Sequence, residues 1–178
     1  RPEPDLMALA DLAALGTICD VVALTGVNRA IVATGLKVMS GWRNPGLAAL
    51  AEVAGVTGAA TTYHAGFLLG PRINAGGRVG RADLGARLLT TDDPGEARRI
   101  AEELDALNAE RRGIEADVLA GALDQVEQAG VREDTAILIA AGDHWHPGVI
   151  GIAAGRVKER FNRPALVIGV DPETGLGK

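Results

Sequence analysis

The chain has 178 residues, of which 47% are hydrophobic and 3% aromatic, and its formal net charge at pH 7 is −5. This length and composition predict an α/β protein with one large or two small domains. The acidic balance excludes a broadly basic nucleic-acid surface, so a site for a polyanion must be local. One cysteine excludes a disulfide framework, and no apolar run is long enough to span a bilayer. We therefore expect a cytoplasmic protein without membrane contact.

The N-terminal third of the chain has the apolar spacing of helices. We expect a first helix over residues 5–15, ended by Gly16 and Thr17, and further helices over 25–40, 47–53 and 83–90. Asp20 follows the first helix inside the apolar run 18–22. A buried carboxylate is costly unless it is hydrogen-bonded, paired or bound to a cation. The residues alone favour a turn or cap aspartate over a ligand.

Residues 70–81 are rich in glycine and arginine and contain no acidic residue. We expect this stretch to be a loop, entered by a helical turn over 63–69, because glycine lets the backbone turn tightly and approach a ligand. Its arginines carry forked donors that suit phosphate oxygens. Two interpretations stay open on spacing alone: a phosphate-binding loop, or a surface turn whose arginines pair with acids of a neighbouring helix.

The segment from Pro94 to Ala129 predicts one long helix, because apolar residues recur at steps of three and four without an internal proline. Asp93 is suited to cap it, and Pro94 to occupy its first position. At 1.5 Å per residue the helix would be on the order of 50 Å long. Its apolar stripe is interrupted at Arg111, which favours a connector between domains over a coiled coil.

Past Gly130 the apolar pattern changes to that of buried strands. We expect strands over 135–141 and 165–170 with a helix over 149–160 between them, which makes a right-handed β-α-β unit. The loop 142–148 then lies at the carboxyl end of a strand and opens a helix, where open α/β sheets bind anions. His144 and His146 form a His-x-His pair, which is weak evidence for a metal without further ligands. Residues 5–129 should thus be almost wholly helical, and two or more strands before residue 90, not counting a short one around 18–22, would contradict the connector.

Three motifs carry a family resemblance: residues 15–24 (LGTICDVVAL), 70–78 (GPRINAGGR) and 144–152 (HWHPGVIGI). In order and spacing they resemble the RecJ-like single-strand-specific exonucleases of the DHH phosphoesterase superfamily. The resemblance implies that residues 1–92 are the C-terminal part of a DHH domain, including the stretch 70–81. It also implies that residues 93–130 are a long connecting helix and residues 131–178 the opening β-α-β of a truncated DHHA1 domain.

The resemblance also implies roles for single residues. Asp20 becomes a metal ligand, the last such carboxylate of the family. Arg72, Asn74 and Arg78, with His146 and Gly148, become contacts to the phosphates of a nucleic acid. The family's Asp-x-Asp, middle aspartate and Asp-His-His motifs would precede residue 1, so no complete catalytic set is expected in this chain.

The activity that the resemblance implies for an intact relative is hydrolysis of single-stranded DNA from 5′ to 3′ in DNA repair and recombination. Two Mn²⁺ or Mg²⁺ ions would activate the water and neutralise the phosphoryl group. A single-stranded-DNA-binding protein is a candidate partner. We expect the chain alone to have no nuclease activity. Two alternatives stay open: a phosphodiesterase acting on oligoribonucleotides or cyclic dinucleotides, and a non-catalytic nucleic-acid-binding scaffold.

Overall fold

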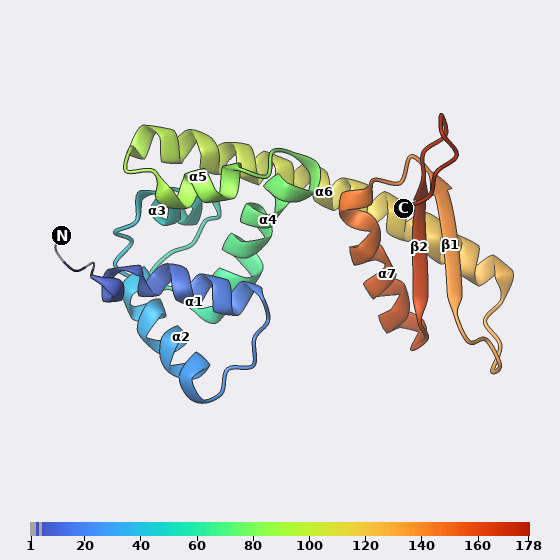
Figure 1. The fold of residues 1–178 in the computed structure, drawn as a ribbon, viewed down its shortest axis with the longest axis horizontal. Coiled ribbons are helices and arrows are strands. Elements are labelled where there is room, and N and C mark those ends of the chain that lie inside the picture. Colours follow the sequence, from blue (N-terminus) through green and yellow to red (C-terminus); the bar gives the residue numbers. More distant parts are fainter. Residues whose placement is uncertain (1–2, 4) are drawn as a thin grey trace. The chain divides into compact units, whose positions relative to one another are not determined.

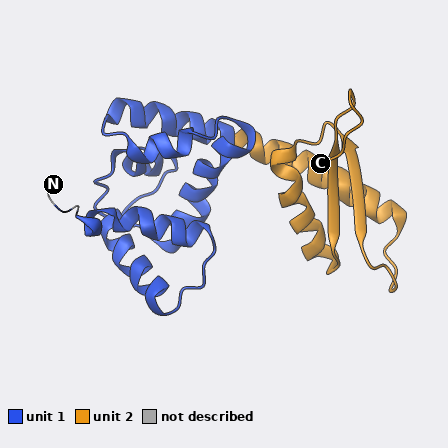
Figure 2. Ribbon diagram, viewed as in Figure 1, with its two compact units in different colours: residues 1–108 blue, residues 109–178 orange. Residues whose placement is uncertain are grey.

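The computed structural model describes residue 3 and residues 5–178, which form two compact units, residues 1–108 and 109–178 (Figures 1 and 2). Helices of the first unit are η1 (Leu6–Leu9), α1 (Ala10–Cys19), α2 (Gly26–Met39), α3 (Pro45–Val53), η2 (His64–Leu69), α4 (Gly70–Val79) and α5 (Leu84–Thr90). The second unit contains β1 (Leu138–Asp143), α7 (Pro147–Phe161) and β2 (Ala165–Val170). In the described part of the chain no strand precedes Leu138, so the predicted helical character of residues 5–129 is confirmed, and the short strand near 18–22 does not form.

Helix α6 (Pro94–Ala129) has 36 residues and contributes to both units. It begins as predicted: the carboxylate of Asp93 accepts a hydrogen bond from the Gly95 N–H at 2.8 Å. Its first turns place Ala97, Ile100, Ala101 and Leu104 in the core of the first unit, and its later turns bury Val118, Ala122 and Val126. Arg111 lies just past the boundary between the two units and pairs with Glu115 one turn along. The interrupted apolar stripe thus marks where the helix passes from one core to the other.

The centre of the first unit's core is built from large apolar side chains of α2, α3, η2, α5 and α6. At most 1% of each of these residues is exposed: Met39, Leu47, Leu50, Leu69, Leu84, Leu88 and Leu104. Helices α1 and α2 pack especially closely, because Gly35 presents no side chain where it meets the carbonyl oxygen of Ala10. Such close backbone contact requires glycine at this position.

The first helix ends later than the sequence predicts. Residues 6–9 form a 3-10 turn, and α1 then continues through Gly16 and Thr17 to Cys19. Inside this helix the Thr17 hydroxyl donates to the Ala13 carbonyl one turn earlier, at 2.7 Å. The next turn is held by tertiary contacts, since the Cys19 thiol meets the Ala65 carbonyl of η2 at 3.8 Å. The prediction that Gly16 and Thr17 end the helix was therefore wrong.

The glycine-rich stretch 70–81 is not a loop. Residues 70–79 form helix α4, which continues from the π-helical η2. Its glycines serve helix packing: a Cβ on Gly70 would lie 2.5 Å from the Cys19 sulfur, and one on Gly76 would lie 3.1 Å from a methyl group of Leu104. Pro71 occupies the first turn, where a missing N–H does no harm. Local glycine content predicted a loop, and packing against α1 and α6 overrides it.

The second unit contains the predicted parallel β-α-β arrangement. Leu138 to Asp143 of β1 pair in register with Ala165 to Val170 of β2, and α7 links the two strands. The first strand begins three residues later than predicted, because Thr135 forms a turn in which its hydroxyl accepts a hydrogen bond from the Arg132 N–H. The predicted division into segments 1–92, 93–130 and 131–178 stays a prediction.

Candidate nucleic-acid interface

Helix α4 carries three of the predicted phosphate-binding residues. Asn74 and Arg78 are exposed and lie one turn apart, whereas Ala75 and Gly76 between them are buried. Residues four apart lie on one face of an α-helix, so an amide group and a guanidinium group are presented side by side to solvent. Arg78 is also in the last turn of α4, where the helix dipole favours a positive charge. The helix thus holds two potential phosphate donors in a fixed relation.

Arg72 has a different environment. Its Nε donates to the Asp105 carboxylate of α6 at 2.8 Å, and its Nη1 donates to the Leu68 carbonyl at 2.8 Å. Only 16% of the Arg72 side chain is exposed. The interpretation in which arginines of this stretch pair with acids of a neighbouring helix therefore describes Arg72, which joins α4 to α6. A phosphate contact by Arg72 stays a prediction and would require this ion pair to open.

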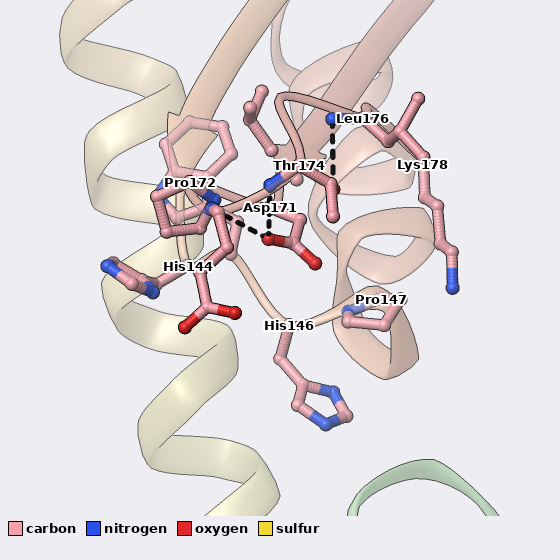
Figure 3. Close-up of a pocket in the computed structure, with 12 residues that line it drawn as sticks. His144, His146, Pro147, Asp171, Pro172, Thr174, Leu176 and Lys178 are labelled. Atoms are coloured by element: carbon pink, nitrogen blue, oxygen red, sulfur yellow. Dashed lines mark hydrogen bonds between the residues drawn. The ribbon is translucent and has the colours of Figure 1, made fainter.

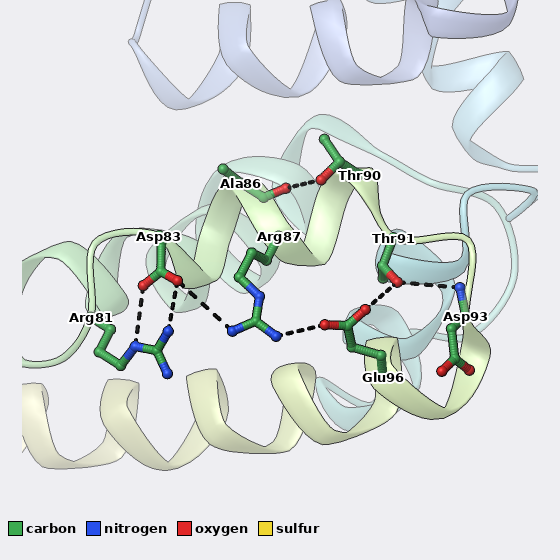
Figure 4. A network of polar contacts seen from close by, with 8 residues as sticks. All are labelled: Arg81, Asp83, Ala86, Arg87, Thr90, Thr91, Asp93 and Glu96. Atoms are coloured by element: carbon green, nitrogen blue, oxygen red, sulfur yellow. Dashed lines mark hydrogen bonds and ion pairs between the residues drawn. The ribbon is translucent and has the colours of Figure 1, made fainter.

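Arg81 is likewise engaged, in a network on the surface beside α5 (Figure 4). Its guanidinium contacts both carboxylate oxygens of Asp83, at 3.2 and 2.7 Å, and Arg87 bridges Asp83 to Glu96. The hydrogen bond from Arg81 is the main reason that the pKa of Asp83 lies below its usual value. Hydrogen bonds from Thr91 and then Arg87 lower the pKa of Glu96. This network pairs Arg81 and Arg87, which follow α4 in the chain, with carboxylates.

Asp20 is the exposed residue that ends α1, and its N–H donates to the Gly16 carbonyl. Burial raises the pKa of the adjacent Cys19 thiol, and the charge of Asp20 raises it further. Within the described residues, no three His, Cys, Asp or Glu side chains are grouped so that they could hold a metal ion. Asp20 therefore occupies a cap position, as the residues alone favoured, and offers a single carboxylate. Its role as a metal ligand stays a prediction.

The second unit places His146 and Gly148 at the start of α7. His146 caps this helix: its Nδ1 accepts a hydrogen bond from the Gly148 N–H at 3.0 Å. Because Nδ1 is the acceptor, the neutral ring carries its proton on Nε2. Gly148 contributes a backbone donor that the histidine ring already uses. His146 and Gly148 thus meet each other, but they belong to a different unit from Asn74 and Arg78.

A depression of about 550 Å³ lies beside His146, at the carboxyl ends of β1 and β2 (Figure 3). Its lining includes His144, His146, Asp171 and Lys178. The Asp171 carboxylate accepts hydrogen bonds from the backbone N–H groups of Glu173 and Thr174, and these bonds lower its pKa. His144 and His146 are not joined by a third ligand in the described structure, so the weak metal interpretation of this pair gains no support.

Trp145 is the residue of this corner that sequence reasoning missed. Three glycines surround it: Cβ atoms on Gly142, Gly169 and Gly121 would lie 2.2, 2.1 and 2.9 Å from Trp145 atoms. The indole ring is thus enclosed by β1 and α6, and the carbonyl group of Trp145 rests against β2. The signal in the sequence was a lone tryptophan between two histidines, flanked by glycines whose partners only the fold reveals. Trp145 fixes the loop that carries His144 and His146.

The known proteins and the solved structures that match this chain include RecJ exonucleases from several bacteria. The chain is 45% identical to the single-stranded-DNA-specific exonuclease RecJ of Dickeya dadantii, over 92% of this chain and 29% of that protein. It is 42% identical to RecJ of Bacillus subtilis, over 96% of this chain and 22% of that protein. The crystal structure of Thermus thermophilus RecJ with Mn²⁺ matches with a TM-score of 0.83 and 39% identity, over 93% of this chain and 24% of that one. No family model matches the chain.

The chain is similar to RecJ over nearly all of its length. The resemblance drawn from the three sequence motifs is therefore confirmed, and so is the fold of a helical part, a long helix and a β-α-β unit. The chain spans less than a third of each curated RecJ relative described above. Within the described residues, none of the helices combines the length and apolar character that a membrane span requires.

Arg72→Ala should lower the free energy of unfolding of this chain by about 1–2 kcal/mol, because it removes the charge-assisted hydrogen bond to Asp105 that holds α4 to α6, and a second one to the Leu68 carbonyl. The effect stays moderate because Asp105 is partly exposed and water can replace its partner. Thermal unfolding of the variant beside Arg78→Ala measures the difference. If Arg72→Ala melts like the wild type yet binds single strands more weakly, Arg72 contacts phosphate as the sequence predicted.

Proposed function

We propose that this chain is part of a RecJ-type exonuclease that hydrolyses single-stranded DNA from 5′ to 3′ in DNA repair and recombination. Its own contribution is to grip the nucleic-acid backbone along α4, through Asn74 and Arg78. The relatives named above are single-stranded-DNA-specific exonucleases, which supports the substrate class. Neither an oligonucleotide or cyclic-dinucleotide phosphodiesterase nor a metal-free scaffold is favoured by a feature of the described residues.

The single observation that carries this proposal is the exposure of Asn74 and Arg78 one turn apart on α4. Arg72 of the same helix is largely buried and contacts Asp105. In an acidic chain, an exposed guanidinium beside an amide donor is a local site for one phosphate rather than part of a basic surface.

Metal chemistry in the proposed enzyme would use carboxylate and imidazole ligands, which suit Mn²⁺ and Mg²⁺. Thermus thermophilus RecJ has been crystallised with each of these ions. Asp20 would supply one carboxylate to such a site. The described residues hold no group of three metal-ligating side chains, so they do not by themselves form a metal centre. The chain alone should show no turnover of single strands in the presence of Mn²⁺, and turnover that purifies with it would contradict this.

Arg78→Ala should weaken binding of the chain to a single-stranded oligonucleotide by about tenfold or more, because a charge-assisted phosphate contact is lost. The dependence of the logarithm of affinity on the logarithm of salt concentration should become shallower by about one contact. The melting temperature should change little, because Arg78 is exposed. Fluorescence anisotropy across a salt series measures the first two effects.

Arg29→Ala is the matched control, since Arg29 is an exposed arginine on α2 and its loss changes the net charge equally. It should leave affinity close to that of the wild type. An Arg78→Ala variant that melts many degrees lower but binds normally would show that α4 is only a structural joint. If Arg78→Ala and Arg29→Ala lose the same affinity for the oligonucleotide, binding depends only on the net charge of the chain.

A further inference from the structure

Two aromatic rings form an exposed stack at the start of the helix that leads into α4. Tyr63 and Phe67 lie with ring centroids 5.3 Å apart and ring planes 21° apart. Tyr63 is 58% exposed and Phe67 71% exposed. Only 3% of the residues of the chain are aromatic, and one of them is a tyrosine. Two of these few aromatic residues form a pair that faces solvent. Exposed aromatic pairs leave ring faces open for a further planar group.

The aromatic pair and the polar pair of α4 lie on the solvent side of one continuous helical segment, residues 63–79. This segment buries Ala65, Leu69 and Ala75 against the core. Phe67 and Arg78 are 11 residues apart in sequence, which corresponds to roughly 16 Å along a helix axis. A stacked strand rises about 3.4 Å per nucleotide along its axis, so this length matches roughly five nucleotides. The part 64–69 is π-helical, a distortion that is frequent at functional sites.

We propose that Tyr63 and Phe67 are a stacking platform for the bases of a single strand whose phosphates contact Asn74 and Arg78. The inference rests on the proposed function. It adds to that function the residues that distinguish an unpaired strand from a duplex. Single-strand binding proteins combine cations that follow the backbone with aromatic rings on which bases stack. A duplex would not fit this arrangement, because its bases are stacked on one another and offer no open face along the strand.

The chemistry of this surface favours a base over an apolar protein partner. Along the same helix the exposed positions after the rings include an amide and a guanidinium, and none of the large apolar side chains of residues 68–79 is exposed. The Tyr63 ring offers a flat apolar face for stacking and a polar hydroxyl group at its edge. This combination suits a base that has water and phosphate beside it. His64 is set edge-on to Tyr63, with ring centroids 6.3 Å apart, and helps to hold the tyrosine ring in place.

The test compares two strands of equal length and charge: an oligothymidylate and an abasic strand with the same phosphodiester backbone. The wild-type chain should bind the strand with bases at least about fivefold more tightly, since each stacked base contributes to affinity. Replacing Tyr63 and Phe67 together with alanine should remove this preference and leave binding of the abasic strand unchanged. Exchanging the rings by Tyr63→Phe and Phe67→Tyr should keep it. The ring protons of Tyr63, the one tyrosine of the chain, should shift upfield on titration with the oligothymidylate.

Met7→Ala is the matched control, because Met7 is an equally exposed apolar residue of the same unit. It should not alter the preference. If both strands bind equally, with salt-dependent affinity and unmoved tyrosine protons, the stacking platform is wrong while backbone binding by α4 stands. If neither strand binds the wild-type chain, the proposed function fails with it. If the alanine pair only reduces self-association of the chain, the rings are a protein contact and the platform is again wrong.

Discussion

Gly169→Ala is expected to destabilise the second unit by about 3 kcal/mol or more. A Cβ at this position would lie 2.1 Å from the carbonyl oxygen of Trp145 and 3.1 Å from its carbonyl carbon. Both atoms are backbone, so no side-chain rotation can relieve the contact. Overpacking typically costs about 1–3 kcal/mol and more where backbone must shift. β2 cannot easily move away, because the Gly169 N–H donates to the Lys178 carbonyl and the Gly169 carbonyl accepts from the Lys178 N–H.

The control for this substitution is Gly155→Ala on α7. A Cβ at Gly155 meets no atom within 4 Å, so alanine should stabilise the helix by up to about 1 kcal/mol through its higher helix propensity. Chemical denaturation compares the two variants, and amide hydrogen exchange locates the effect. Loss of protection at Ala140 and Val167, with Leu50 of the first unit unchanged, would assign the damage to the sheet. A Gly169→Ala variant as stable as Gly155→Ala would show that the Trp145 loop is not held by this contact.

The sequence predicted the elements that have a regular apolar period. The helix over 94–129 and the β-α-β unit follow from spacing, because one face of each element must be buried whatever its partner is. The stretch 70–79 could not be predicted in this way. Its glycines indicate a loop by local preference, yet Gly70 and Gly76 are there to meet Cys19 and Leu104, which are 51 and 28 residues away in sequence. Close packing depends on both segments that meet, so it cannot be predicted from the residues of one segment alone.

The candidate site was predictable to a similar degree. Arg72, Asn74 and Arg78 were proposed together from the family resemblance, but only the fold distinguishes them, because the partner of Arg72 is Asp105 on a distant helix. Asp20 as a cap follows from the residues, whereas its role as a ligand depends on residues beyond this chain. The aromatic pair was not singled out at all. Tyr63 and Phe67 have the spacing of a buried helical stripe, and their exposure becomes visible only when the other face of η2 is seen in the core.

Gly35→Ala is expected to destabilise the first unit by about 3 kcal/mol or more. Its Cβ would lie 2.1 Å from the carbonyl oxygen of Ala10 and 2.4 Å from the Cβ of Ala14, so α1 and α2 would have to separate. Neither neighbour can rotate away, since one is backbone and the other a side chain without a rotatable carbon. The control is Gly16→Ala on α1, where a Cβ meets nothing within 4 Å and helix propensity should improve.

The same substitution should also weaken binding of single strands, although Gly35 is remote in sequence from α4. Helix α1 ends at Cys19, whose sulfur would lie 2.5 Å from a Cβ on Gly70. The end of α1 is therefore closely packed against the first residue of α4. If α1 moves away from α2, it should shift the first turn of α4, the helix that carries Asn74 and Arg78. Asp20, at the end of α1, should move together with α1. Anisotropy at a temperature where the variant is still folded by circular dichroism separates this effect from unfolding. Affinity equal to that of Gly16→Ala under those conditions would show that α4 is positioned by α6 alone, through the ion pair of Arg72 with Asp105.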